Sequence, residues 1–191
     1  MDRSLDCVPV LFRVFPFLAG AAPQEKGGPL YTPRLSAGRL DNPDTYSVLY
    51  LSDAAAGAIA EAFGRFAEWT PAILGGSPSL PGSVRAIARY QLPDELPVCN
   101  LDDPDRLSEL RLRPSEIVSR DYARTRIWAR KIYDRRIWIG VRWWSYYDPR
   151  WGSLGLWEPK KLVLEEALEL RLDSAPLIEA SRAISRRIIG E

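Results

Sequence analysis

Three side chains able to do chemistry, Arg39, Tyr50 and Glu61, follow one another at intervals of eleven residues. An arginine binds anions through forked hydrogen bonds, and a glutamate can act as an acid, a base or a negative charge beside a developing cation. The chain contains no histidine, which excludes Ser-His and Cys-His nucleophile systems and the usual zinc ligand sets. A hydrolytic reaction would therefore need carboxylate chemistry, or a substrate whose leaving group departs without being protonated.

These side chains are expected on a turn, a strand and a helix in succession. Arg39 lies in a segment punctuated by Gly and Pro, where Asn42-Pro43 is a good turn initiator. Residues 47–51 are apolar and predict a short strand, and residues 54–69 predict a helix. The buried face of that helix is expected to consist of Ala58, Ile59, Ala62, Phe63 and Phe66.

Glu61 stands beside this apolar face, after a start that Ser52-Asp53 could cap. A glutamate on an amphipathic helix is most often a solvated charge. The small residues around it, Ala58, Ala60 and Ala62, would let another element approach closely. That feature favours a site without establishing one.

Further strands are predicted from alternation and from runs of branched and aromatic residues, over 8–15, 83–92, 138–144 and 154–157. Residues 162–172 fit one or two strands, or a helix, because Glu165-Glu166-Ala167-Leu168 has high helix propensity. A second helix is predicted from Ser119 or Asp121 to Arg135, with Tyr122 among its inward residues.

A closing helix is predicted over residues 174–189, with Ser174 as N-cap and Pro176 in its first turn. The irregular order of strands and helices, without G-x-G-x-x-G or G-K-[ST], disfavours Rossmann and P-loop sites. We therefore predict an α+β fold, a mostly antiparallel mixed sheet flanked by helices. One domain is expected over residues 1–191, with its core at about 8–172.

The composition is that of an ordinary globular protein, with 26 Lys and Arg against 25 Asp and Glu. Overall charge therefore gives no field that would attract nucleic acid or an anionic membrane. No apolar run approaches a membrane span and no secretory signal is evident, so a cytoplasmic location is expected. The cysteines, Cys7 and Cys99, suggest buried reduced thiols rather than a disulfide or a metal site.

Arg13 in Phe12-Arg13-Val14 and Ser145 in Trp144-Ser145-Tyr146 complete an ordered set with Arg39, Tyr50 and Glu61. This set resembles the RES domain, a bacterial family named after its Arg, Glu and Ser, and the resemblance extends from Leu11 to about Pro159. Many members have Trp where this chain has Leu40, and an aromatic where it has Val14. One aromatic wall of the pocket is thus either missing or supplied from elsewhere.

The resemblance implies a fold related to the ADP-ribosyltransferases and an enzyme that consumes NAD. It implies toxin-like cleavage of the nicotinamide–ribose bond, with ADP-ribose passed to inorganic phosphate or to water. NAD would be the substrate, and no cofactor or metal is expected. The implied partner is a helix-turn-helix antitoxin.

A site without histidine suits this reaction, because nicotinamide leaves as a neutral pyridine and needs no general acid. Arg13 and Arg39 would bind the pyrophosphate, and Tyr50 would stack on the nicotinamide. Glu61 would stabilise the cationic ribosyl centre, as carboxylates do in glycoside hydrolysis. Ser145 would orient ribose or the nucleophile by hydrogen bonding, because no histidine is present to activate it.

Each residue also has a structural interpretation. Arg13 could face solvent, Arg39 could pair with Asp41 or Asp44, Tyr50 could be a core aromatic, and Ser145 could bond nearby backbone. Together, the ordered set favours function.

Two other functions remain open at this stage. A protein ADP-ribosyltransferase would use the same cleavage with a macromolecular acceptor. A noncatalytic nucleic-acid-binding module could use the arginines of 106–136 and the tryptophans of 128–157. The acidic residues in that stretch favour a solvated helix face instead, although Arg124, Arg126 and Arg130 could line a phosphate entrance or contact an acidic partner.

Overall fold

An eight-stranded sheet, mostly antiparallel, forms the centre of the molecule in the computed structural model, which describes residues 10–93, 96–157 and 159–190. Its strand order is β4-β5-β1-β2-β8-β7-β6, with β9 also paired to β5. Only the β6–β7 pair is parallel among the described pairings of this sheet. The strands are β1 (Val10–Phe17), β2 (Leu49–Ser52), β4 (Gly75–Ser77), β5 (Leu80–Gln91), β6 (Val98–Asn100), β7 (Gly140–Trp144), β8 (Gly152–Leu156) and β9 (Val163–Glu169). The predicted α+β class and antiparallel sheet are confirmed.

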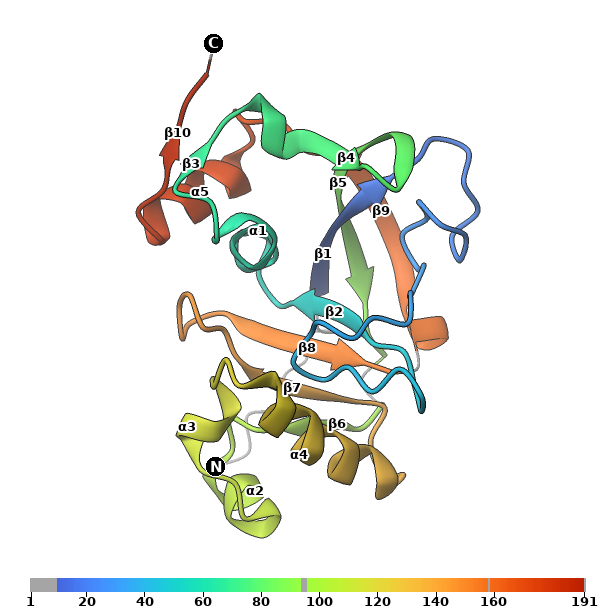
Figure 1. The fold of residues 1–191 in the computed structure, drawn as a ribbon, viewed down its shortest axis with the longest axis vertical. Coiled ribbons are helices and arrows are strands. Elements are labelled where there is room, and N and C mark those ends of the chain that lie inside the picture. Colours follow the sequence, from blue (N-terminus) through green and yellow to red (C-terminus); the bar gives the residue numbers. More distant parts are fainter. Residues whose placement is uncertain (1–9, 94–95, 158, 191) are drawn as a thin grey trace.

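Two groups of helices pack against the sheet (Figure 1). One group lies beside β6 and β7, and the other lies with the small parallel sheet of β3 (Glu68–Trp69) and β10 (Arg187–Ile188). The first group is α2 (Pro104–Leu110), α3 (Pro114–Ile117) and α4 (Tyr122–Asp134), and the second is α1 (Ala55–Phe63) and α5 (Ala175–Ala183). Short 3-10 turns occur at Pro71–Leu74 and Pro159–Lys161. Among the described residues, no helix is both long and apolar enough to cross a bilayer.

The alternation predicted for residues 83–92 matches the structure from Ala86 onward, whereas Val84 is only partly buried and Ser83 is buried. Ala86, Ala88 and Tyr90 of β5 are fully buried, while the intervening residues are partly exposed. One edge of β5 pairs with β1, and the other pairs with β9, so residues 163–169 form a strand and not a helix. Pairing along the sheet edge thus overrides the helix propensity of this segment.

Both ends of the first predicted helix differ from the expectation of 54–69. Its N-cap is Ala54, because the Asp53 carboxylate instead accepts hydrogen bonds from Gly152 N at 2.6 Å and Arg142 Nη2 at 2.9 Å. The helix ends at Phe63, and the chain turns at Gly64 towards β3.

The closing helix ends at Ala183 and not at residue 189. Ser185 takes a left-handed conformation with φ of 53°, which no regular helix continues through. Residues 187–188 then pair with 68–69 of β3. One long-range pairing therefore explains why both predicted helices were too long.

Of the two cysteines, Cys99 is a buried free thiol, as predicted, and Cys7 lies outside the described residues. Burial raises the pKa of the Cys99 thiol to about 12. The thiol is therefore protonated at neutral pH.

The revised end of α1 makes a stability prediction. Ile59→Ala should lower the free energy of unfolding by about 2–5 kcal/mol, because Ile59 is fully buried between α1 and its neighbours. Phe66→Ala is the control: Phe66 lies past the end of α1 and is 38% exposed, so its loss should cost well under about 1 kcal/mol. Urea unfolding of both variants tests this. Equal losses of unfolding free energy in the two variants would contradict the end of α1 at Phe63 and support the longer predicted helix.

Candidate active site

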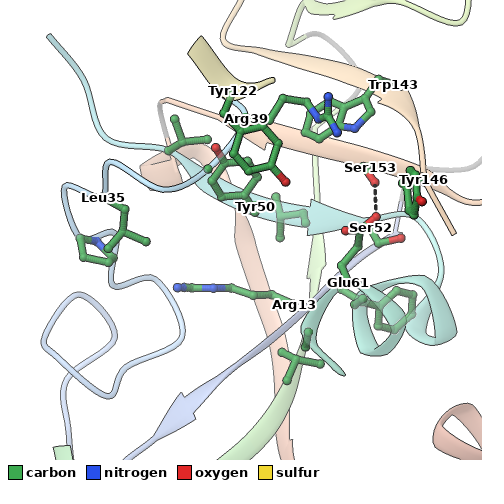
Figure 2. Close-up of a pocket in the computed structure, with 18 residues that line it drawn as sticks. Arg13, Leu35, Arg39, Tyr50, Ser52, Glu61, Tyr122, Trp143, Tyr146 and Ser153 are labelled. Atoms are coloured by element: carbon green, nitrogen blue, oxygen red, sulfur yellow. Dashed lines mark hydrogen bonds between the residues drawn. The ribbon is translucent and has the colours of Figure 1, made fainter. Parts of the chain in front are cut away.

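A cavity of about 350 Å³ opens between β1, β2, α1 and the ends of β7 and β8. Four of the five residues singled out in the sequence line it, Arg13, Arg39, Tyr50 and Glu61. Figure 2 shows these side chains with Ser153, Tyr122, Trp143 and Tyr146, which come from other elements. Ser145 does not line the cavity, but its hydroxyl donates a hydrogen bond to Glu61, which does.

The floor of the cavity is a row of residues directly opposite one another across four strands. Phe12 pairs with Ser52, Ser52 with Ser153, and Ser153 with Trp143. Directly opposed residues share one face of a sheet, and all four line the cavity. Strand register therefore brings β1, β2, β8 and β7 together at one site.

Glu61 extends from α1 over this row, and its side chain is exposed to the cavity. Its Oε1 accepts a hydrogen bond from Ser145 Oγ at 2.7 Å and lies 3.5 Å from Ser153 Oγ. Close packing of the helix allows these contacts: a Cβ at Gly57 would lie 2.4 Å from Ser52 Oγ. Gly57, which the sequence analysis did not single out, therefore lets α1 approach β2 closely.

Ser145 is 2% exposed and follows β7 directly. Its backbone N–H donates to Trp151 O at 2.7 Å, and its hydroxyl accepts from Tyr147 N at 3.2 Å. The hydroxyl proton is thereby directed to Glu61. Ser145 thus has both a backbone contact and a carboxylate contact, and it positions Glu61 without reaching the cavity.

Arg39 is nearly buried but forms no ion pair with a carboxylate of the described chain, Asp41 and Asp44 included. Its Nη1 donates to the carbonyls of Ile117 and Ser119, the latter at 2.7 Å. Burial lowers the pKa of Arg39, while Tyr122 and Glu61 nearby favour its charge. Among the described residues, Arg39 is thus held by backbone carbonyls and not by a direct ion pair, with Glu61 as a nearby negative charge.

The loop that carries Arg39 is held by Tyr50. The Tyr50 hydroxyl donates to Asp41 Oδ1 at 2.8 Å and accepts from Leu40 N at 2.9 Å. Asp41 Oδ2 also accepts from Gly38 N at 2.6 Å, and a Cβ at Gly38 would lie 2.4 Å from the Tyr50 hydroxyl oxygen. Burial, and then the charge of Asp41, raise the pKa of Tyr50. The tyrosine is therefore a neutral clamp whose ring lines the cavity.

Arg13 does not simply face solvent. Its Nη1 donates to Pro29 O at 3.0 Å and Tyr31 O at 2.9 Å. The hydroxyl of Tyr90 donates to the same Pro29 carbonyl at 2.6 Å. Burial lowers the pKa of Arg13, and the side chain links β1 to the loop that follows it.

The aromatic walls come from residues that the motif did not identify. Leu40 is fully buried in the core and does not line the cavity. Trp143, Tyr122 and Tyr146 line it instead. Tyr122 was predicted to face inward, but 36% of it is exposed. Side chains alternate between the two faces of a strand, which would place Trp143 on the same face as Ser145. This alternation is the sequence signal that could have identified Trp143.

The arginines of α4 are each engaged by other groups of the protein. Arg124 pairs with Asp121 at 3.1 Å, Arg130 pairs with Asp134 at 2.8 Å, and Arg126 donates to Gly38 O at 3.1 Å. None of the three lines the cavity. Within the described ranges, no group of three acidic or cysteine side chains could hold a metal ion.

Comparisons with known proteins agree with this architecture. The family model of the RES domain matches residues 11–174. A chain in the crystal structure of the M. tuberculosis MbcT–MbcA toxin–antitoxin complex superposes with a TM-score of 0.61 at 16% identity, covering 94% of this chain and 90% of that one. No curated protein matches by sequence. At this identity the structural likeness concerns the fold.

The clamp around Arg39 makes a testable prediction. Tyr50→Phe leaves the buried Asp41 carboxylate and the Leu40 N–H short of one partner, so it should cost about 1–3 kcal/mol of unfolding free energy. Tyr31→Phe is the matched control, because the Tyr31 hydroxyl bonds no described residue. Denaturant unfolding measures both, and a Tyr50→Phe variant as stable as the control would show that the clamp is not needed.

Proposed function

The chain belongs to the RES domain family, and from this we propose that it is an NAD-consuming enzyme that cleaves the nicotinamide–ribose bond. The observation that carries the proposal is a single cavity lined by one hydrogen-bonded carboxylate, Glu61, and by two arginines that form no ion pair with a carboxylate of the described residues. NAD has the complementary charges. Its pyrophosphate is anionic, and its ribosyl carbon becomes cationic as nicotinamide leaves.

In this proposal Arg39 and Arg13 bind the pyrophosphate. The Nη1 atom of Arg39 is occupied by backbone carbonyls, but its Nη2 atom donates to no described residue and remains available for a phosphate oxygen. Trp143 and Tyr50, whose rings meet edge-to-face with centroids 6.5 Å apart, offer aromatic surface for the nicotinamide. Binding at both ends would place the scissile bond near Glu61.

Glu61 stabilises the oxocarbenium-like centre. Its Oε1 is held by Ser145, and its Oε2 accepts no hydrogen bond from a described residue. A carboxylate fixed before the reaction needs no reorganisation when positive charge develops. Nicotinamide departs with the electron pair of the C–N bond, and no proton is needed for it to leave.

The acceptor then forms the new bond at the ribosyl carbon. An oxygen lone pair of inorganic phosphate gives ADP-ribose phosphorylated at that carbon, whereas water gives ADP-ribose and releases a proton. We propose phosphate or water as the acceptor, and a protein acceptor would mark the transferase alternative. The ion pairs of Arg124 and Arg130 offer no support for a nucleic-acid-binding module.

We further propose that the protein acts as a toxin in the cytoplasm, under the control of a helix-turn-helix antitoxin. The structural neighbour is part of a toxin–antitoxin complex, and family membership supports the same role for this chain. Co-purification with the product of an adjacent helix-turn-helix gene would test the partnership.

The central test is nicotinamide release from NAD, with and without phosphate, by the wild type and by Glu61→Gln. Glutamine keeps the shape of the side chain and the bond from Ser145 but removes the charge. Turnover should therefore fall by about a hundredfold. Glu179→Gln, on the exposed side of α5, is the matched control and should retain full activity. Unchanged turnover in Glu61→Gln would remove Glu61 from the mechanism.

The two serines that contact Glu61 lie at different distances from its carboxylate and should therefore contribute differently to activity. Ser145→Ala removes a 2.7 Å hydrogen bond to the carboxylate and should lower kcat by about tenfold or more. Ser153→Ala removes only a 3.5 Å contact and should have a smaller effect. In the Glu61→Gln background both effects should shrink, because the serines act through the carboxylate charge. Fully additive losses would show that Ser145 acts independently of Glu61.

A further inference from the structure

Arg120 is a cation with no assigned role that contacts a residue lining the cavity. Its guanidinium carbon lies 4.3 Å from the ring centroid of Tyr146, and Tyr146 lines the cavity. The side chain is exposed, and within the described residues it has neither a hydrogen-bond acceptor nor a carboxylate partner. Exposed arginines farther along, such as Arg124 and Arg130, are paired with carboxylates.

The backbone brings Arg120 to the side of Arg39. Arg39 donates to the carbonyls of Ile117 and Ser119, which fixes the segment that immediately precedes Arg120. The ring of Tyr122, two residues further on, lies 5.5 Å from the Arg39 guanidinium carbon. Burial is the main cause of the lowered pKa of Arg39, and the charge of Arg120 lowers it further. The two guanidinium groups are thus near enough to interact, and neither forms an ion pair with a carboxylate of the described residues.

The platform beneath Arg120 also connects to the carboxylate. Tyr146 follows Ser145, which donates to Glu61, and its ring meets that of Tyr147 edge-to-face at 5.5 Å between centroids. A Cβ at Gly64 would lie 2.4 Å from the Tyr147 ring, so this pair packs directly on the end of α1. Stacking on Tyr146 therefore holds the Arg120 guanidinium near the reacting end of the site.

We propose that Arg120 binds a phosphate group of the reactants at the mouth of the cavity. A guanidinium forms bidentate hydrogen bonds to phosphate, and stacking on an aromatic ring leaves its planar N–H edge available for them. The identity of the phosphate compound rests on the proposed function. Two sources share this chemistry, the pyrophosphate of the dinucleotide and free inorganic phosphate.

The first experiment compares Arg120→Gln with Arg124→Gln, an exposed arginine outside the cavity. Calorimetric titration of the full chain with ADP and with inorganic phosphate measures binding without turnover. Michaelis constants for NAD and for phosphate measure the same contacts during the reaction.

Arg120→Gln should weaken ADP binding and raise the Michaelis constant for NAD by about tenfold if the pyrophosphate is bound. If free phosphate is bound, the constants for phosphate should change instead. Arg124→Gln should change neither.

The outcomes separate this inference from the proposed function. Binding of ADP or phosphate that depends on Arg120, without release of nicotinamide from NAD, would support the phosphate site and overturn the enzyme. If Arg120→Gln cleaves NAD and its dissociation constants for ADP and phosphate and its Michaelis constants for NAD and phosphate are unchanged, the phosphate site is overturned. The proposed enzyme activity would then still hold. A wild type that binds neither ADP nor phosphate and cleaves no NAD would overturn both.

Tyr146 provides a second variant. Tyr146→Leu removes the ring under Arg120 and should change the same dissociation and Michaelis constants as Arg120→Gln. Tyr146→Phe keeps the ring and should leave these constants unchanged. The double variant Arg120→Gln/Tyr146→Leu should be little worse than either single variant, because both changes remove one contact. Additive losses would show that the ring does not hold the arginine and would overturn this part of the inference.

Discussion

The hydrogen bond from Ser145 to Glu61 joins the two halves of the site. Glu61 belongs to α1, which packs with α5 and β3, whereas Ser145 follows β7, which packs with α4. For the two to meet at 2.7 Å, α1 must lie close to the β7–β8 turn. Gly57 and Gly64 permit this, since a side chain at either would strike Ser52 or Tyr147. The position of one carboxylate oxygen thus constrains the packing of a whole helix.

Charge is distributed unevenly around the cavity. Arg13 and Arg39 satisfy their buried nitrogens with backbone carbonyls, which are dipoles and leave the positive charge uncompensated. Glu61 is the one carboxylate among the described side chains that line the cavity, and serines hold it. Neutral partners on both sides preserve opposite charges in one partly enclosed space, where Coulomb interactions are stronger than in water. Such an arrangement favours a ligand that is anionic at one end and cationic at the other.

Local residue patterns predicted most of the helices and strands, whereas pairing between residues distant in the sequence determined where some of the helices end. Local residue types predicted a strand at 47–51, observed as Leu49–Ser52, and a helix start at Ser119 or Asp121. Asp121 is the N-cap and accepts from Arg124 N at 3.4 Å. The ends of α1 and α5 depend instead on residues 68–69 pairing with 187–188, which no local pattern encodes. The site behaves similarly. Four of its five motif residues line one cavity, but the row of Ser52, Ser153 and Trp143 depends on strand register.

Leu40 belongs to the core and not to the walls of the cavity. Leu40 is fully buried, and a Cβ at Gly155 would lie 2.2 Å from its Cδ1, so Gly155 is needed to accommodate it. The position therefore contributes to the core under β8, and its backbone N–H serves Tyr50. Aromatic surface comes instead from β7, α4 and the turn after β7, through Trp143, Tyr122 and Tyr146. The charged groups come from β1, α1 and the loop before β2. Because different segments supply the charges and the walls, a change in a wall residue need not displace the charged groups.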